Sequence, residues 1–344
     1  MTIPGIDRVR RTARRVTNMF VSRAMILLYH RVAELPQDPQ LLCVSPSHFI
    51  EHLQVIRRWG RTIQLGKLDQ VLQGVDRRRH MIIVTFDDGY ADNFYNAKPL
   101  LERYDVPATV FVATGYLRSK REFWYDELEK IFLHTGPLPD TLRLKINERY
   151  YEWELGSDAN GGESFSDWNV SRKDDPTVRH CIYRTVFQIL HPLPDTERQK
   201  ILEYLAAWAG MDTASRATHR TLLPQELIRL ADGGLVEIGS HTVSHPVLSA
   251  LPVAQQVDEI ARSKACLEEM LGHRVASFAY PFGGRSHYTQ ETVGVVRDAG
   301  FDWACSNFAG MVRPNTDRWQ LPRFLVRDWD GQEFAHRLSQ WFRS

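Results

Sequence analysis

Two short stretches of the chain combine carboxylates and imidazoles in a pattern that suits a hydrolytic metal site. The first, VTFDDGY, places Asp87 and Asp88 directly after an apolar run. The second, EIGSHTVSHP, places His241 after another apolar run and His245 four residues later. A carboxylate and two imidazoles are ligands that zinc and related metals accept, and the second carboxylate can take a proton from an attacking water. The pattern predicts metal-assisted hydrolysis.

Both stretches are predicted to follow buried strands. The run MIIVTF before the aspartates and the run GLVEIGS before the histidines have the apolar character of strands inside an α/β protein. Parallel α/β folds gather the carboxyl ends of their strands in one crevice, which would bring the two stretches together. The four-residue spacing of His241 and His245 predicts one face of a helical turn. Alone, DDG is typical of a solvated turn and HxxxH of a surface pair.

At these residues the chain resembles the polysaccharide deacetylase family, the carbohydrate esterases with a NodB homology domain. TFDDG is similar to the first motif of that family and HTVSH to the second, with support from LLYHRV, VPATVFVATGYL, FAYPFGG and LPRF. The resemblance spans roughly residues 24–117 and 230–327. It implies an α/β fold, a distorted (β/α)7-like barrel, within a single domain over residues 24–344.

The resemblance also implies a metal centre and a reaction. Asp88, His241 and His245 would bind a divalent metal, zinc in the first place, with cobalt, nickel or iron as alternatives. Asp87 would act as the base. The implied reaction removes an N-acetyl group from a sugar in a glycan or a glycan precursor, which is lipid-linked, nucleotide-linked or polymeric.

The FAYPFGG stretch is expected to form another edge of the site. By resemblance, the backbone N–H of Phe282 would stabilise the oxyanion of the tetrahedral intermediate. We expect Tyr280 and Pro281 in the same stretch to contact the substrate.

Two positions depart from the common family pattern. Many members carry an arginine, paired with the base, where this chain has Ala279, and Arg323 in LPRF is a candidate replacement; a surface ion pair is the alternative for Arg323. No catalytic histidine follows LPRF, so His30, after the run AMILLY, is the candidate proton donor, with a packed strand-end histidine as the alternative. Asp328 and Asp330 are candidates to orient His30.

An insertion of about 110 residues, at about 118–230, is not covered by the family motifs. A β-hairpin is expected near 142–155, a mobile polar loop at 156–176, and helices at 177–190 and 195–209. An aromatic floor for a sugar, with a carboxylate for its hydroxyls, is predicted where the insertion begins; core packing is the alternative for these residues, which are Trp124, Tyr125 and Asp126.

Composition indicates a globular protein with a full-sized core. Of its 344 residues, 43% are hydrophobic and 25% charged, and the net charge of +1 argues against a nucleic-acid binder. The four cysteines show no CxxC pairing and predict free thiols in a reducing compartment.

Residues 1–23 are predicted to form a basic amphipathic helix. Apolar residues recur at helical spacing between Ile6 and Phe20, with five arginines among them. Such a helix would lie on a membrane surface or on the barrel. We expect a cytoplasmic protein, peripheral to the inner face of the membrane if the helix binds lipid.

Two other functions stay open at this point. The missing arginine at Ala279 leaves room for a barrel that binds carbohydrate without turnover. Hydrolysis of an amide or formamide C–N bond outside sugars is the other alternative.

Overall fold

A parallel β-sheet forms the centre of the computed structural model, which describes residues 23–73, 80–146, 148–162 and 165–343. The strand order is β11-β10-β9-β6-β5-β1-β12, with β4 beside β5, and every pairing within this sheet is parallel. The strands are β1 (Ala24–Tyr29), β4 (Gly60–Thr62), β5 (His80–Phe86), β6 (Ala108–Val112), β9 (Val236–Ser240), β10 (Ser277–Ala279), β11 (Trp303–Cys305) and β12 (Phe324–Leu325).

The sheet curls into the distorted barrel that the resemblance implied. Its two edges approach each other where Leu321, just before β12, forms a parallel bridge to Cys305 in β11. The backbone N–H of Leu321 donates to Ala304 O, and that of Ser306 donates to Leu321 O, both at 2.8 Å. The strands are almost wholly buried because helices cover the outer face and side chains fill the inner one.

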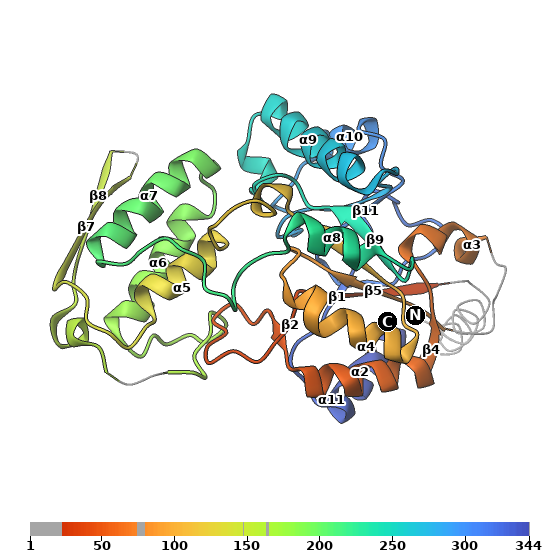
Figure 1. Ribbon diagram of the computed structural model, residues 1–344, viewed down its shortest axis with the longest axis horizontal. Helices are drawn as coiled ribbons and strands as arrows, with labels where there is room; N and C mark the ends of the chain where they lie inside the picture. The colour runs from red at the N-terminus through yellow and green to blue at the C-terminus, as the bar shows by residue number, and fades with distance from the viewer. Residues whose placement is uncertain (1–22, 74–79, 147, 163–164, 344) are drawn as a thin grey trace, which may run out of the picture.

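Helices cover the barrel on two sides: α9 and α10 lie on one side, and α2, α4 and α11 lie on the opposite side (Figure 1). The barrel helices are α2 (Pro46–Trp59), α3 (Leu68–Leu72), α4 (Lys98–Tyr104), α8 (Pro224–Ala231), α9 (Val253–Leu271), α10 (Gln290–Asp298) and α11 (Gly331–Arg343). Short elements connect them: β2 (Arg31–Val32), β3 (Cys43–Val44), η1 (Leu65–Lys67), η2 (Asn93–Ala97), η3 (Thr114–Tyr116) and η5 (Leu248–Ala250).

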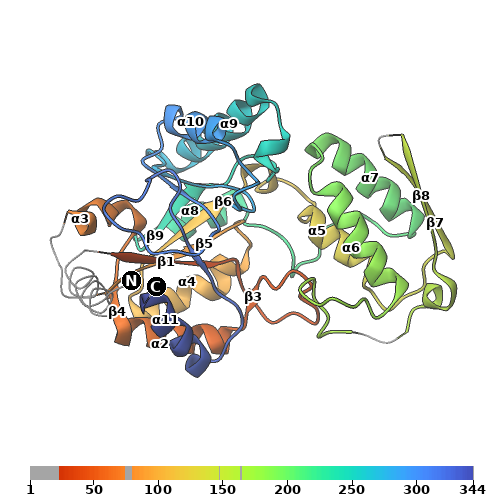
Figure 2. The same cartoon turned by 180° about the vertical axis from the view of Figure 1, so that it is seen from behind.

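The insertion forms a lobe at one end of the molecule, beside the barrel (Figures 1 and 2). It consists of α5 (Trp124–Phe132), the hairpin β7 (Thr141–Ile146) and β8 (Arg149–Glu154), η4 (Gly156–Asn160), α6 (Val178–Leu190) and α7 (Asp195–Trp208). A core cluster distinct from the barrel core holds these elements together. Leu227 and Leu230 of α8 belong to the barrel core, so the lobe ends before the expected boundary near residue 230.

Most predicted elements of the lobe are present. The hairpin and both helices are found close to their expected bounds. The segment 156–176 was predicted to be a mobile loop, but it contains η4, and Trp168 within it is buried, with its indole N–H donating to Asp174 O at 3.1 Å. The polar composition of the segment concealed this large apolar anchor.

The predicted helix at residues 1–23 lies almost wholly outside the described residues, so membrane association and location stay predictions. Among the helices that the structure describes, none has the length and apolar character needed to cross a bilayer. All four cysteines are free thiols.

Candidate metal centre and active site

Three buried side chains converge at the carboxyl ends of β5 and β9. Asp88 Oδ1 lies 3.5 Å from His241 Nε2 and 3.4 Å from His245 Nε2. One ligand atom from each residue lies within 4.8 Å of the others, as in a metal-binding group. Two ligands bound at 2.0–2.1 Å in a tetrahedral zinc site are separated by roughly 3.3 Å. The spacing of these donor atoms therefore fits a divalent metal.

The orientation of His241 and of Asp88 leaves the right atoms free for a metal. His241 Nδ1 donates to Ala279 O at 2.7 Å, so the lone pair of Nε2 faces the other ligands. The Tyr125 hydroxyl donates to Asp88 Oδ2 at 2.9 Å and leaves Oδ1 available. Burial lowers the pKa of His245 to about 3, which keeps this imidazole neutral, the form that binds a metal.

The two histidines do not share a helical turn, contrary to the prediction from their spacing. Residues 241–247 form an irregular loop in which Thr242 and His245 have φ of 68° and 54°. Thr242 Oγ1 accepts from the His245 N–H at 3.1 Å, and Glu259 of α9 accepts from the Ser244 N–H at 2.8 Å. These contacts hold a left-handed backbone that turns both rings to one point, with ring centroids 4.9 Å apart.

The turn after β5 directs two adjacent carboxylates differently. Asp88 and Gly89 both have positive φ, at 75° and 78°. A Cβ on Gly89 would lie 3.1 Å from Val112, so this position favours glycine both by conformation and by space. The turn aims Asp88 at the histidines and leaves Asp87 Oδ2 at 3.9 Å from His241 Nε2.

Arg323 reaches Asp87 and holds both of its oxygens. Nη1 donates to Oδ1 and Nη2 to Oδ2, each at 2.7 Å, and Nε donates to Ser306 O at 2.7 Å. Both side chains are buried, so the alternative interpretation of Arg323, a surface ion pair, is wrong. Burial raises the pKa of Asp87, but Arg323 together with His241 and His30 more than offsets this, so the net pKa is lowered and the group is a carboxylate.

His30 follows β1 and faces the same site. Asn93 holds its backbone by donating to His30 O at 2.8 Å, while the ring makes no hydrogen bond to the described residues. The prediction that Asp328 or Asp330 orients His30 is wrong. Asp328 instead accepts from Ser45 N before α2, and Asp330 accepts from a backbone N–H in the first turn of α11.

These residues border a pocket of about 220 Å³ between the barrel and the lobe. Its lining comes from strand ends of the barrel, the loop before β3, and two residues of the lobe. The lining residues are His30, Gln40, Leu42, Asp87, Asp88, Tyr125, Phe187, His241, His245, Phe282, His287, Asn307, Leu325 and Arg327.

Of the predicted aromatic floor, only Tyr125 lines this pocket. Trp124 is 2% exposed and packs on Phe187, with ring centroids 4.7 Å apart. Asp126 is buried and accepts from the Tyr90 hydroxyl at 2.7 Å. Trp124 and Asp126 are therefore core residues of the lobe, and the prediction that they contact a sugar is not met by their positions.

In the FAYPFGG turn, Phe282 lines the pocket while Tyr280 and Pro281 do not. The Tyr280 hydroxyl donates to Trp319 O at 2.9 Å on the barrel side, and Pro281 is buried. Neither side chain therefore lies on the wall of the pocket, where the substrate contacts were expected. Phe282 has φ of 59°, and the described part of the chain offers its N–H no acceptor. This N–H is free to bind an oxyanion.

Comparison with known proteins decides the family. The model of the polysaccharide deacetylase family matches residues 74–144 and 187–304, more than half of the chain. The chain belongs to the polysaccharide deacetylase family.

Relatives of this deacetylase family differ in how much of the chain they cover. YxkH of Bacillus subtilis (strain 168), named after the same family, is 25% identical over 111 residues, and the match spans 32% of this chain and 38% of YxkH. IcaB from Ammonifex degensii matches with a TM-score of 0.57 and 19% identity over 94% of this chain and 98% of IcaB. The Streptococcus pyogenes deacetylase PplD matches with a TM-score of 0.56 and 17% identity over 92% of this chain and 98% of PplD. These structures show the same fold.

Some pocket residues of this family member were not predicted from the sequence. Asn307 and Arg327 follow β11 and β12, so the rule that parallel strands end at the site would have found them. Gln40 and Phe187 come from a loop and from α6 of the lobe, and no local signal placed them near the metal ligands.

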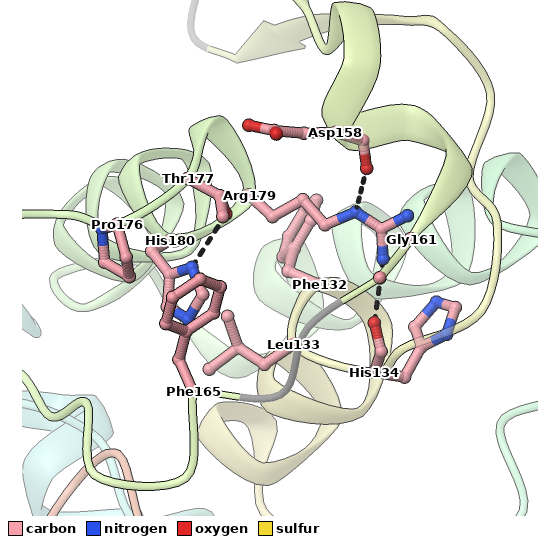
Figure 3. A pocket seen from close by; sticks show the side chains of 11 residues that line it. Phe132, Leu133, His134, Asp158, Gly161, Phe165, Pro176, Thr177, Arg179 and His180 are labelled. Atoms are coloured by element: carbon pink, nitrogen blue, oxygen red, sulfur yellow. Dashed lines mark hydrogen bonds between the residues drawn. The ribbon is translucent and has the colours of Figure 1, made fainter.

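A second hollow, of about 280 Å³, lies inside the lobe of this deacetylase (Figure 3). Arg179 extends along it and donates to the carbonyl oxygens of His134, Gly136, Asp158 and Ala159, at 2.7 to 3.0 Å. Because its guanidinium donates to backbone carbonyl oxygens from separate segments, Arg179 has a structural role in the lobe.

Proposed function

We propose that the chain is a metal-dependent N-deacetylase that removes an acetyl group from an N-acetylated sugar in a glycan or its precursor. One observation carries the proposal: three metal-ligand atoms, a carboxylate fixed by Arg323, a free histidine and a free backbone N–H border one pocket. Membership of the polysaccharide deacetylase family supports it. The relative PplD, described as a deacetylase in complex with acetate, supports release of the same product.

The residues divide the reaction among them. A divalent metal held by Asp88, His241 and His245 would polarise the acetyl carbonyl and make water more acidic. Asp87 accepts the proton of the attacking water, and its bidentate pairing with Arg323 fixes the direction of its lone pairs. Zinc is our first candidate, because one carboxylate and two imidazoles are usual zinc ligands.

The other two groups act on the substrate itself. The Phe282 N–H donates to the oxyanion of the tetrahedral intermediate. Stabilising this charge commonly contributes a large part of an enzyme's rate enhancement. His30 donates a proton to the departing amine nitrogen. Burial lowers the pKa of His30, so its protonated ring is a stronger acid than a free imidazolium.

The alternative of a barrel without turnover rested on Ala279. Arg323, directly before β12, supplies the cation that Ala279 lacks, so this alternative has lost its support.

Acetate release from a panel of polymeric, nucleotide-linked and lipid-linked N-acetylhexosamines tests the proposal. Asp87→Asn should lower kcat by about 10²- to 10⁴-fold while the variant keeps its metal. Asp258→Asn on the exposed face of α9 is the matched control and should retain activity. Release of acetate by Asp87→Asn at the wild-type rate, with metal retained, would remove Asp87 as the base.

A further inference from the structure

We propose that Arg327 binds an anionic group of the sugar substrate, a phosphate or a carboxylate, in the pocket that takes the acetamido group. This inference rests on the proposed function and narrows its substrate class. Arg327 follows β12 and lines the pocket that contains the metal ligands, and it forms no ion pair within 4.0 Å among the described residues.

The backbone of a neighbouring loop fixes this guanidinium. Nη1 donates to Leu41 O and, at 3.4 Å, to Gln40 O. The other N–H groups have no acceptor among the described residues. Asp38, the carboxylate that acts on Arg327 from nearby, already accepts from Leu42 N at 2.9 Å and Cys43 N at 2.8 Å. A planar, anchored fork with free donors suits an oxyanion.

The charge of the site favours the same ligand. The charge of Asp87 is balanced by Arg323, and a divalent metal would exceed the charge of Asp88. Arg327 then adds a further positive charge to the pocket. Burial lowers the pKa of Arg327 despite the nearby charge of Asp38, which reflects the cost of holding a cation there without a direct ion pair. An anion in the pocket would offset this cost.

Arg179 in the lobe provides the contrast. It donates to four backbone carbonyl oxygens and so has filled its donors within the protein. Arg327 uses one nitrogen for its anchor, has no acceptor for the others among the described residues, and lines the pocket that holds His30 and Asp88. The difference distinguishes a structural arginine from one that is open to a ligand.

The position of the anion follows from sugar chemistry. In an N-acetylhexosamine, the acetamido group at C2 is adjacent to the C1 substituent, so a C1 phosphate lies close to the reacting amide. Nucleotide-linked and lipid-linked sugars share such a phosphate. A uronic acid carries a carboxylate instead, at the far side of the ring.

Substrate preference tests the inference. The three probes are N-acetylglucosamine 1-phosphate, N-acetylglucosaminuronic acid and the neutral methyl N-acetylglucosaminide. The wild type should prefer one anionic probe, and which one distinguishes phosphate from carboxylate. Arg327→Met should lower the ratio of kcat/KM for that probe to kcat/KM for the neutral probe by about 10- to 100-fold. Arg327→Lys should keep part of the preference, and Arg103→Met on the exposed face of α4 should keep all of it.

Calorimetry with deacetylated ligands gives a readout without turnover. Glucosamine 1-phosphate or glucosaminuronic acid should bind the metal-loaded wild type more tightly than methyl glucosaminide, and Arg327→Met should lose that difference. If no probe releases acetate, the proposed function fails while calorimetry still decides the role of Arg327. Equal binding of charged and neutral ligands, or an unchanged preference in Arg327→Met, would overturn the inference.

Discussion

The barrel site and the insertion lobe satisfy their charged and polar groups in opposite ways. In the lobe, Arg216 pairs with Glu122 at 2.7 Å and with Glu129 at 2.6 Å, and Arg179 is filled with carbonyl oxygens. At the barrel site, the His30 ring and the Phe282 N–H face a pocket without a protein partner among the described residues. Paired charges and filled hydrogen bonds hold the lobe together, whereas the unpaired hydrogen-bonding groups at the barrel site are available to a substrate.

Breaking a closed network should cost stability. Arg216→Met removes the guanidinium that pairs with the buried carboxylates of Glu122 and Glu129, so we expect the free energy of unfolding to fall by about 3–5 kcal/mol. Urea titration with a probe in the lobe, such as Trp168, measures the change. Arg318→Met removes an exposed pair with Asp69 and should cost less than about 1 kcal/mol. Equal losses of unfolding free energy in the two variants would contradict a stabilising role for the buried network of the lobe.

Tyr125 joins the two regions, because α5 of the lobe carries it to the metal ligand Asp88. Tyr125→Phe should weaken metal affinity by about 10- to 100-fold, as expected for the loss of a partner that orients a ligand. Competition with a chelating dye gives the affinity, and circular dichroism checks the fold. Tyr150→Phe on the exposed hairpin is the matched control. Unchanged metal affinity in Tyr125→Phe would show that the lobe lines the pocket without contributing to metal binding.

A buried histidine of the barrel should give a smaller, pH-dependent effect. Burial lowers the pKa of His52 to about 4, and its neutral ring donates to Trp329 O at 2.7 Å. Below pH 6.5 the unfolded state binds a proton that the folded state does not. The free energy of unfolding therefore decreases as the pH is lowered from 6.5 to about 4. The loss is at most about 1.4 kcal/mol per pH unit.

His52→Gln should therefore show a flatter fall in stability between pH 6.5 and 5 than the wild type. Urea titrations at both pH values measure it, with His336→Gln on the exposed face of α11 as the control. An equally steep fall in His52→Gln would assign the pH dependence to other groups.

The strand ends were predictable from the sequence, whereas the route of the insertion was not. Asp88 and His241 follow apolar runs, and parallel strands bring such ends together, so their meeting followed from local patterns. Phe187 reaches the same pocket from a helix about 100 residues after the first motif, and only tertiary packing places it there. Trp124 and Tyr125 illustrate the limit, because neighbours in the sequence differ in whether they face core or pocket.

The loop between the histidines shows a second limit. A four-residue spacing indicates a helical turn, but the positive φ of Thr242 and His245 produces the same convergence without a helix. Such conformations are uncommon outside glycine, most of all for the β-branched Thr242, and depend on contacts such as that of Glu259, which lies in another element. Spacing predicted that the ligands meet and gave the wrong backbone.

Metal stoichiometry tests the central claim most directly. After chelation and dialysis against zinc, the wild-type chain should bind one equivalent by inductively coupled plasma mass spectrometry, and Asp88→Ala should bind none while Asp69→Ala, an exposed control, binds one. A wild type that binds no divalent metal at neutral pH, or an Asp88→Ala variant that binds a full equivalent, would contradict the account.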